Sequence, residues 1–398
     1  MRRLSRRERW RRVFRNAELL PGNQVRLLQG GAEFFPALRA AIDAARVEIH
    51  VETYIFHADA TTRGVRDALA RAARRGVRVR LMIDGFGARE LPADWLALLR
   101  AAGVAVLAYR PRAAGWLANP ASLRRLHRKL AVIDAERAFV GGINLIDDYE
   151  PVRHPAPRLD FSVEVRGPVL ADIHASVRRL WRLVALTQLR RPRAAADLAP
   201  RWPTDGRMRA AFVVRDNLAH RRDIERGYLA ALALAQHEIW IANAYFLPGR
   251  RFRILLKKAA ARGVRVRLLV QDRTDHPFFL AAARALYRDL LAAGVVIHEY
   301  AASEMHAKVA VVDGRWATVG SSNIDPFSLL LAREANLVVD DAGFAHELRR
   351  RLAAAFDAAP ALDPGRWQRR AWPRRALSWL AYGTVRAIVG LAGGARWD

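Results

Sequence analysis

Two segments of the chain combine side chains that can transfer a phosphoryl group without a metal. Each follows the pattern His-x-Lys-x4-Asp, with His127, Lys129 and Asp134 in the first and His306, Lys308 and Asp313 in the second. One histidine can attack phosphorus and form a covalent intermediate. The other can act as general acid and then as general base, because its pKa lies near working pH. Lysine ammonium groups can stabilise the phosphate charge. The pattern therefore predicts one phosphoryl-transfer site that uses both segments.

The spacing within each segment predicts where these side chains point. The residues between each Lys and Asp are apolar, which is typical of a central strand buried on both faces. Because residues i and i+2 of a strand project to one face, each His points together with its Lys. Asp134 and Asp313 follow at the far end of the strand, in a turn. We include them in the catalytic set but expect a structural or orienting role.

The choice of lysine supports this interpretation. Only four of the 67 basic residues are lysines, and two of them are Lys129 and Lys308. Arginine is used almost everywhere else, which resembles a high-GC coding bias. Lysine is a compact point charge, whereas arginine is a planar fork, so a site that holds one phosphate oxygen closely can require the ammonium.

Amide and acidic side chains follow each motif at corresponding places. The segments GGIN (141–144) and GSSN (320–323) supply Asn144 and Asn323, which we expect to donate to phosphate oxygens. Asp160 and Glu334 come later in each copy. Such a carboxylate would accept Nδ1–H from a histidine and leave Nε2 free to react.

The chain is an internal repeat that alternates strands and helices. Residue pairs such as Tyr54 and Tyr245, or His127 and His306, occupy matching places in the two copies, and the first copy has a longer loop around residues 110–122. Alternating strands and helices predict an α/β layered fold. We expect helices at 63–75, 94–102, 169–184 and 342–356, and a strand at 77–83. Tyr54 and Tyr245 end matching strands and either line the site or belong to the core.

The limits of the two repeat copies and the composition between and beyond them divide the chain into five predicted segments. They are a basic N-terminal segment (1–21), a first α/β domain (22–188), a linker rich in Pro and Arg (189–207), a second α/β domain (208–358) and a C-terminal tail (359–398). The N-terminal segment suits a basic amphipathic helix on anionic lipid, or a solvated tail. For 376–394 we expect an interfacial or re-entrant segment, with a helix docked on the protein as the alternative. We find no secretory signal and no clear membrane-spanning stretch.

Composition narrows the function further. Cysteine is absent, which excludes disulfides, a thiolate nucleophile and Cys-ligated metal sites. The hydrophobic fraction of 52% indicates a folded chain. The formal net charge of +28 predicts attraction to a polyanion, either nucleic acid or an anionic membrane surface.

Together the duplicated His-x-Lys-x4-Asp motif and the GGIN and GSSN segments resemble the phospholipase D superfamily. The resemblance covers roughly residues 22–358. Within the superfamily the chain is most similar to bacterial cardiolipin synthases, particularly the short type without N-terminal membrane spans. It implies two tandem phospholipase D-like domains with mixed sheets flanked by helices, related by a pseudo-twofold axis around one active site. It also implies no metal or cofactor, with His127 as nucleophile and His306 as acid and base.

The resemblance implies a phosphatidyl transfer in which two phosphatidylglycerol molecules give cardiolipin and glycerol through a phosphohistidine. The expected partners are anionic phospholipid and a membrane surface, and the expected location is peripheral, on the cytoplasmic face of the cell membrane. Phosphatidylethanolamine could replace one phosphatidylglycerol. The alternative is a phospholipase D or nuclease-type phosphodiesterase, although the apolar C-terminus makes nucleic acid the less favoured partner. A membrane-binding protein with an inactive repeat is a further alternative, which the two complete motifs disfavour.

Overall fold

The computed structural model describes residues 18–111, 124–150, 156–190, 198–202, 205–216, 219–274, 276–326, 328 and 332–393. The first half contains β1 (Leu20–Gln29), α2 (Gly30–Ala44), β2 (Glu48–Thr53), α3 (Ala60–Arg74), β3 (Arg78–Asp84), α4 (Ala93–Ala101), β4 (Ala105–Tyr109), β5 (Lys129–Ile133), β6 (Arg137–Gly141), β7 (Phe161–Arg166) and α5 (Leu170–Thr187).

The second half repeats this order and adds two helices. It contains β8 (Met208–Arg215), α6 (Asp223–Leu234), β9 (Glu238–Asn243), α7 (Arg250–Ala261), β10 (Arg265–Gln271), α8 (Pro277–Ala292), β11 (Val296–Tyr300), β12 (Lys308–Val312), β13 (Trp316–Gly320), β14 (Glu334–Asp340) and α10 (Ala342–Asp357), followed by α11 (Pro364–Gln368) and α12 (Trp372–Gly393).

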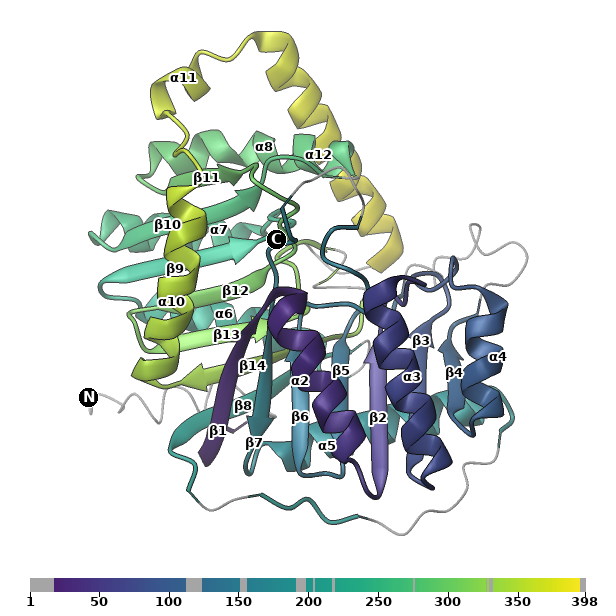
Figure 1. The fold of residues 1–398 in the computed structure, drawn as a ribbon. Coiled ribbons are helices and arrows are strands. Elements are labelled where there is room, and N and C mark those ends of the chain that lie inside the picture. The colour runs from purple at the N-terminus through teal and green to yellow at the C-terminus, as the bar shows by residue number, and fades with distance from the viewer. Residues whose placement is uncertain are drawn as a thin grey trace.

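All strands named above join one 14-stranded mixed sheet, in the order β11-β10-β9-β12-β13-β14-β8-β1-β7-β6-β5-β2-β3-β4. The two halves meet where β1 pairs with β8, and the strand order reads the same outward from that junction in both directions. Figure 1 shows the two halves as sheets covered by helices. The α/β fold with two related halves is confirmed.

The core explains why the halves stay together. One cluster of buried side chains contains residues of both halves, among them Val140, Val163, Val309 and Leu337. These strands are apolar on alternate positions or throughout, and burying them removes large apolar area from water. The strands β5 and β12, which begin at Lys129 and Lys308, are fully buried, so their starting residues are held by the core.

Most predicted elements are present with small shifts in their ends. The expected helices correspond to α3, α4, α5 and α10, and the expected strand to β3. The sequence analysis gave no ranges for α2, α6, α7, α8 or α11. Residues 1–17, most of the long loop at 110–122 and the middle of the linker lie outside the described residues.

The C-terminal segment forms a helix that packs on the protein, as the alternative to the interfacial or re-entrant segment expected. Helix α12 lies along α8 and buries Ser378, Ala381, Tyr382 and Val385 (Figure 1). No helix in the described part of the chain is both long and apolar enough to cross a bilayer.

Candidate active site

The two His-x-Lys motifs meet at the junction of the halves. The backbone N–H of His127 donates to the carbonyl of Arg333 at 2.9 Å, and that of His306 donates to the carbonyl of Leu159 at 2.9 Å. Arg333 and Leu159 each directly precede one of the predicted carboxylates. Each motif is therefore fixed by the backbone of the opposite half.

This arrangement crosses the histidine–carboxylate pairs. His127 Nδ1 lies 2.9 Å from Glu334 Oε1, and His306 Nδ1 lies 2.6 Å from Asp160 Oδ2. Both carboxylates are almost completely buried. In each pair Nδ1 is committed to the carboxylate, which leaves Nε2 as the reactive nitrogen, and each pair requires both halves of the chain.

Small residues in the GGIN and GSSN segments make room for these carboxylates. A Cβ atom on Gly142 would come within 2.2 Å of Asp160 Oδ1, so only glycine allows that carboxylate its place. At the corresponding position of the second half, Ser321 Oγ donates to Glu334 Oε2 at 2.5 Å. The sequence analysis did not identify Ser321 as a site residue, although its place in GSSN is a signal for it.

Both lysines are buried beside the histidines. Lys129 Nζ donates to the carbonyl of His127 at 2.6 Å, and Lys308 Nζ donates to the carbonyl of His306. Burial disfavours the charged ammonium, so it lowers the pKa of Lys129 to about 7 and that of Lys308 to about 8. Because both ammonium groups are buried, an anion bound beside them would stabilise their charged forms.

Burial also shifts the other titratable groups of the site. It lowers the pKa of His127, an effect that the nearby Glu334 partly offsets. Burial and the nearby Lys308 and Lys129 ammonium groups lower the pKa of His306 well below its usual value. Burial raises the pKa of Asp160 to about 7. These surroundings favour neutral imidazoles, and a bound phosphate anion would favour their protonated forms.

The two asparagines lie within the site walls. Asn144 Oδ1 accepts the backbone N–H of Ile55 at 3.1 Å, which ties the GGIN segment to the end of β2. Asn323 is buried, and its Oδ1 has no hydrogen-bond partner among the described residues. Their expected role as phosphate donors stays a prediction.

The tyrosines that end matching strands lie in different surroundings. The Tyr54 ring packs edge-on against the His127 ring, with centroids 5.0 Å apart, and Lys129 Nζ lies 5.4 Å from the Tyr54 centroid. Tyr54 therefore contacts the first His-x-Lys motif. The Tyr245 hydroxyl accepts a hydrogen bond from Thr274 Oγ1 at 3.2 Å.

The structure does not bring Asp134 and Asp313 to the histidines. Each follows the far end of its strand. The Asp134 carboxylate accepts the backbone N–H groups of residues 46, 47 and 48, at 2.7 to 2.8 Å. Asp313 binds residues 236, 237 and 238 in the same way, at 2.8 to 3.2 Å. Both have φ of 51°, a left-handed conformation that Asp tolerates better than most residues. They fix the starts of β2 and β9, which is the structural role we expected.

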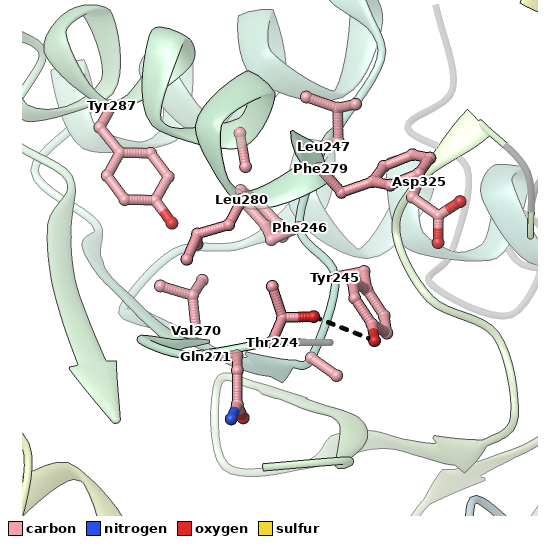
Figure 2. Close-up of a pocket in the computed structure, with 12 residues that line it drawn as sticks. Tyr245, Phe246, Leu247, Val270, Gln271, Thr274, Phe279, Leu280, Tyr287 and Asp325 are labelled. Atoms are coloured by element: carbon pink, nitrogen blue, oxygen red, sulfur yellow. Dashed lines mark hydrogen bonds between the residues drawn. The ribbon is translucent and has the colours of Figure 1, made fainter. Parts of the chain in front are cut away.

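A small, largely apolar pocket adjoins the second motif. Apolar side chains from α8, including Phe279, Leu280 and Tyr287, form much of its wall, and Tyr245 and Thr274 supply hydroxyl groups (Figure 2). Two hydrogen bonds link its wall to the residues on either side of His306: Ala244 N–H to Ala307 O at 3.0 Å, and Met305 N–H to the Gln271 side chain at 2.5 Å.

Within the described residues, one cluster away from this site has metal-ligand geometry, namely Glu48, His50 and His174. Its members already bond to one another and to an arginine. His174 Nε2 lies 2.6 Å from Glu48 Oε1, and Arg80 Nη1 lies 3.2 Å from His50 Nε2. Because the guanidinium only donates, that His50 nitrogen is an acceptor. These side chains form a polar layer between the sheet and α5.

A duplicated α/β fold with two His–Lys motifs and crossed carboxylates at one junction defines a phospholipase D-like class of phosphoryl-transfer protein. A family model described as cardiolipin synthase, phospholipase D-like domain, matches residues 38–150 and 228–355. The chain belongs to this family.

Related proteins support the assignment over the whole length. The chain is 40% identical to cardiolipin synthase B of Salmonella typhimurium, over 94% of this chain and 90% of that protein. It is 33% identical to cardiolipin synthase A of Pseudomonas entomophila, over 85% of this chain and 70% of that longer relative. A solved structure of phosphatidylserine synthase from Haemophilus influenzae matches the fold with a TM-score of 0.70 at 15% identity, covering 98% of this chain and 99% of that one.

Proposed function

We propose that the protein is a phosphatidyltransferase that makes cardiolipin and glycerol from two molecules of phosphatidylglycerol. Its family membership supports this activity. The crossed His127–Glu334 and His306–Asp160 pairs are the observation on which the proposed mechanism rests. Water in place of the second lipid would turn the same site into a hydrolase, which is the enzymatic alternative.

In the first step, His127 Nε2 attacks the phosphorus of one phosphatidylglycerol. A P–N bond forms and the P–O bond to glycerol breaks. The His306 imidazolium gives its Nε2 proton to the departing glycerol oxygen. Lys129 and Lys308, with Asn144 and Asn323 as further donors, stabilise the charge on the phosphate oxygens.

In the second step, a glycerol hydroxyl of another phosphatidylglycerol attacks the phosphohistidine. Neutral His306 takes the hydroxyl proton, the new P–O bond forms and the P–N bond breaks. One phosphodiester is used and one is made, so the exchange needs no nucleotide. Glu334 and Asp160 stabilise the imidazolium forms and orient both rings.

The substrate implies the location. We propose peripheral association with the cytoplasmic face of the cell membrane, where anionic phospholipid supplies both donor and acceptor. The positive charge of the chain supports attraction to such a surface. Phosphatidylethanolamine as one of the two lipids stays an alternative.

The test uses the purified full chain in mixed micelles with phosphatidylglycerol, with lipid products and glycerol followed together. Cardiolipin and glycerol in equal amounts, lost in His127→Ala and in His306→Ala, support the transferase. Phosphatidic acid with glycerol would instead identify a hydrolase. Turnover that persists in both variants would show that the reaction does not take place at the proposed site.

A further inference from the structure

Helix α12 has an outer face that is unusual for a helix on a protein surface. Its inner face packs on α8 through Ser378, Ala381, Tyr382 and Val385, which repeat at helical spacing. Residues one half-turn away face outward. Among the large apolar side chains there, Leu377 is 61% and Leu380 is 68% exposed.

The outer face carries no charge between Leu377 and Val385. The exposed positions in this stretch are Leu377, Trp379, Leu380, Gly383 and Thr384. A helix whose outer face contacts water normally presents charged residues there. Here the apolar side chains on the inner face are matched by a second set on the outer face, so α12 is apolar on two opposite sides.

The charged residues of α12 are three arginines, and all of them lie outside the stretch from Leu377 to Val385. Arg374 and Arg375 lie in the first turn, and Arg386 lies near the Tyr382 ring, 6.0 Å from its centroid. By helical spacing, all three fall closer to the inner face than Leu380 does. Trp372 and Trp379, which are 76% and 50% exposed, complete the apolar surface. Tryptophan suits the boundary between headgroups and acyl chains.

We propose that this outer face of α12 docks the protein on an anionic phospholipid bilayer, with the helix lying in the interface. The apolar side chains would enter the acyl boundary, and the arginines would meet the phosphate headgroups. The charge pattern selects a bilayer over a second copy of this chain, because a chain with a net charge of +28 repels its copy and is attracted to anionic lipid.

Docking by α12 also connects the bilayer to the active site. Helix α12 packs on α8. Helix α8 in turn supplies Phe279, Leu280 and Tyr287 to the wall of the pocket beside the segment that contains His306 (Figure 2). The helix pair therefore places the second half of the site next to the lipid surface. This orientation of the active site rests on the proposed function, because only an enzyme with a lipid substrate needs its site next to the bilayer.

The test measures binding of the full chain to vesicles of phosphatidylcholine with and without phosphatidylglycerol. The variant Leu377→Ser/Leu380→Ser removes two exposed leucines, and we expect it to weaken binding about 10- to 100-fold. The matched control is Leu183→Ser/Leu186→Ser on α5, which changes two leucines that are 45% and 61% exposed. It should bind as the unaltered chain does.

A second readout locates the helix directly. Phospholipid brominated on its acyl chains should quench tryptophan fluorescence on binding, and Trp379→Phe should lose part of that quenching. Unaltered vesicle binding by the α12 variant would overturn the proposal. A change from dimer to monomer in that variant, with vesicle binding intact, would overturn it in favour of a second copy. Vesicle binding through α12 without cardiolipin formation would leave the docking proposal standing and overturn the proposed function instead.

Discussion

His127 and Glu334 are 207 residues apart in sequence, yet the His127 imidazole Nδ1 lies 2.9 Å from the Glu334 carboxylate. The reciprocal pair, His306 and Asp160, lies 2.6 Å apart across the same junction. Each catalytic histidine is therefore oriented by the half of the chain that does not contain it. Joining the two halves completes both pairs at once.

Replacing Glu334 by Gln should slow turnover about 10²- to 10⁴-fold, because the amide neither fixes the histidine tautomer nor stabilises the imidazolium. Lipid turnover under saturating substrate is the measurement. Combining Glu334→Gln with His127→Ala should add little to the loss from His127→Ala alone, since the two residues act as a unit. Fully additive losses would show that Glu334 acts independently of His127.

Replacing Gly142 by Ala should reduce turnover while the protein stays folded. The new Cβ would come within 2.2 Å of Asp160 Oδ1 and push that carboxylate away from His306. Lipid turnover and circular dichroism are the two measurements. Gly343→Ala on α10 is the control, because its Cβ would meet only the Asp341 side chain, at 3.3 Å. Full activity in the Gly142→Ala variant would mean that Asp160 need not hold its position.

The rate should fall as the pH rises above about 8. The pKa of Lys129 is lowered to about 7 and that of Lys308 to about 8, so both ammonium groups lose their proton, and with it their charge, well below the usual pH for lysine. The neutral amines stabilise the phosphate less. The dependence of kcat/KM on pH, which reports groups of the unliganded enzyme, is the measurement. A rate that stays constant up to pH 10 would contradict this role.

Replacing Asp134 by Ala should destabilise the fold. The change removes an acceptor for three backbone N–H groups at the start of β2 and should lower the free energy of unfolding by about 1–3 kcal/mol. Urea denaturation measures this loss, and Asp134→Asn, which keeps one carbonyl oxygen and tolerates the left-handed backbone, should lose less. A stable Asp134→Ala protein without activity would instead assign the carboxylate a chemical role.

The sequence was sufficient for the fold class and for most of the residues that meet at the junction. The repeat and the periodic apolar pattern depend on local spacing, so they can be read along the chain. The crossed pairing depends on how β1 and β8 join the halves, which no local pattern determines. The sequence placed Ser321 and Tyr54 near the motifs, but their contacts with Glu334 and His127 come from the tertiary fold. The docking of α12 on α8 likewise depends on tertiary packing, because its composition alone suits lipid and protein equally.

The most direct measurement traps the covalent intermediate. Phosphatidylglycerol labelled in its phosphate is mixed with the unaltered chain, the reaction is stopped during turnover in alkali, where phosphohistidine survives, and the labelled peptide is mapped. We predict label on His127 and none in the His127→Ala variant. Label on His306 in the His127→Ala variant would reverse the two roles. Absence of label in the unaltered chain while it forms cardiolipin would contradict a covalent relay between the two halves.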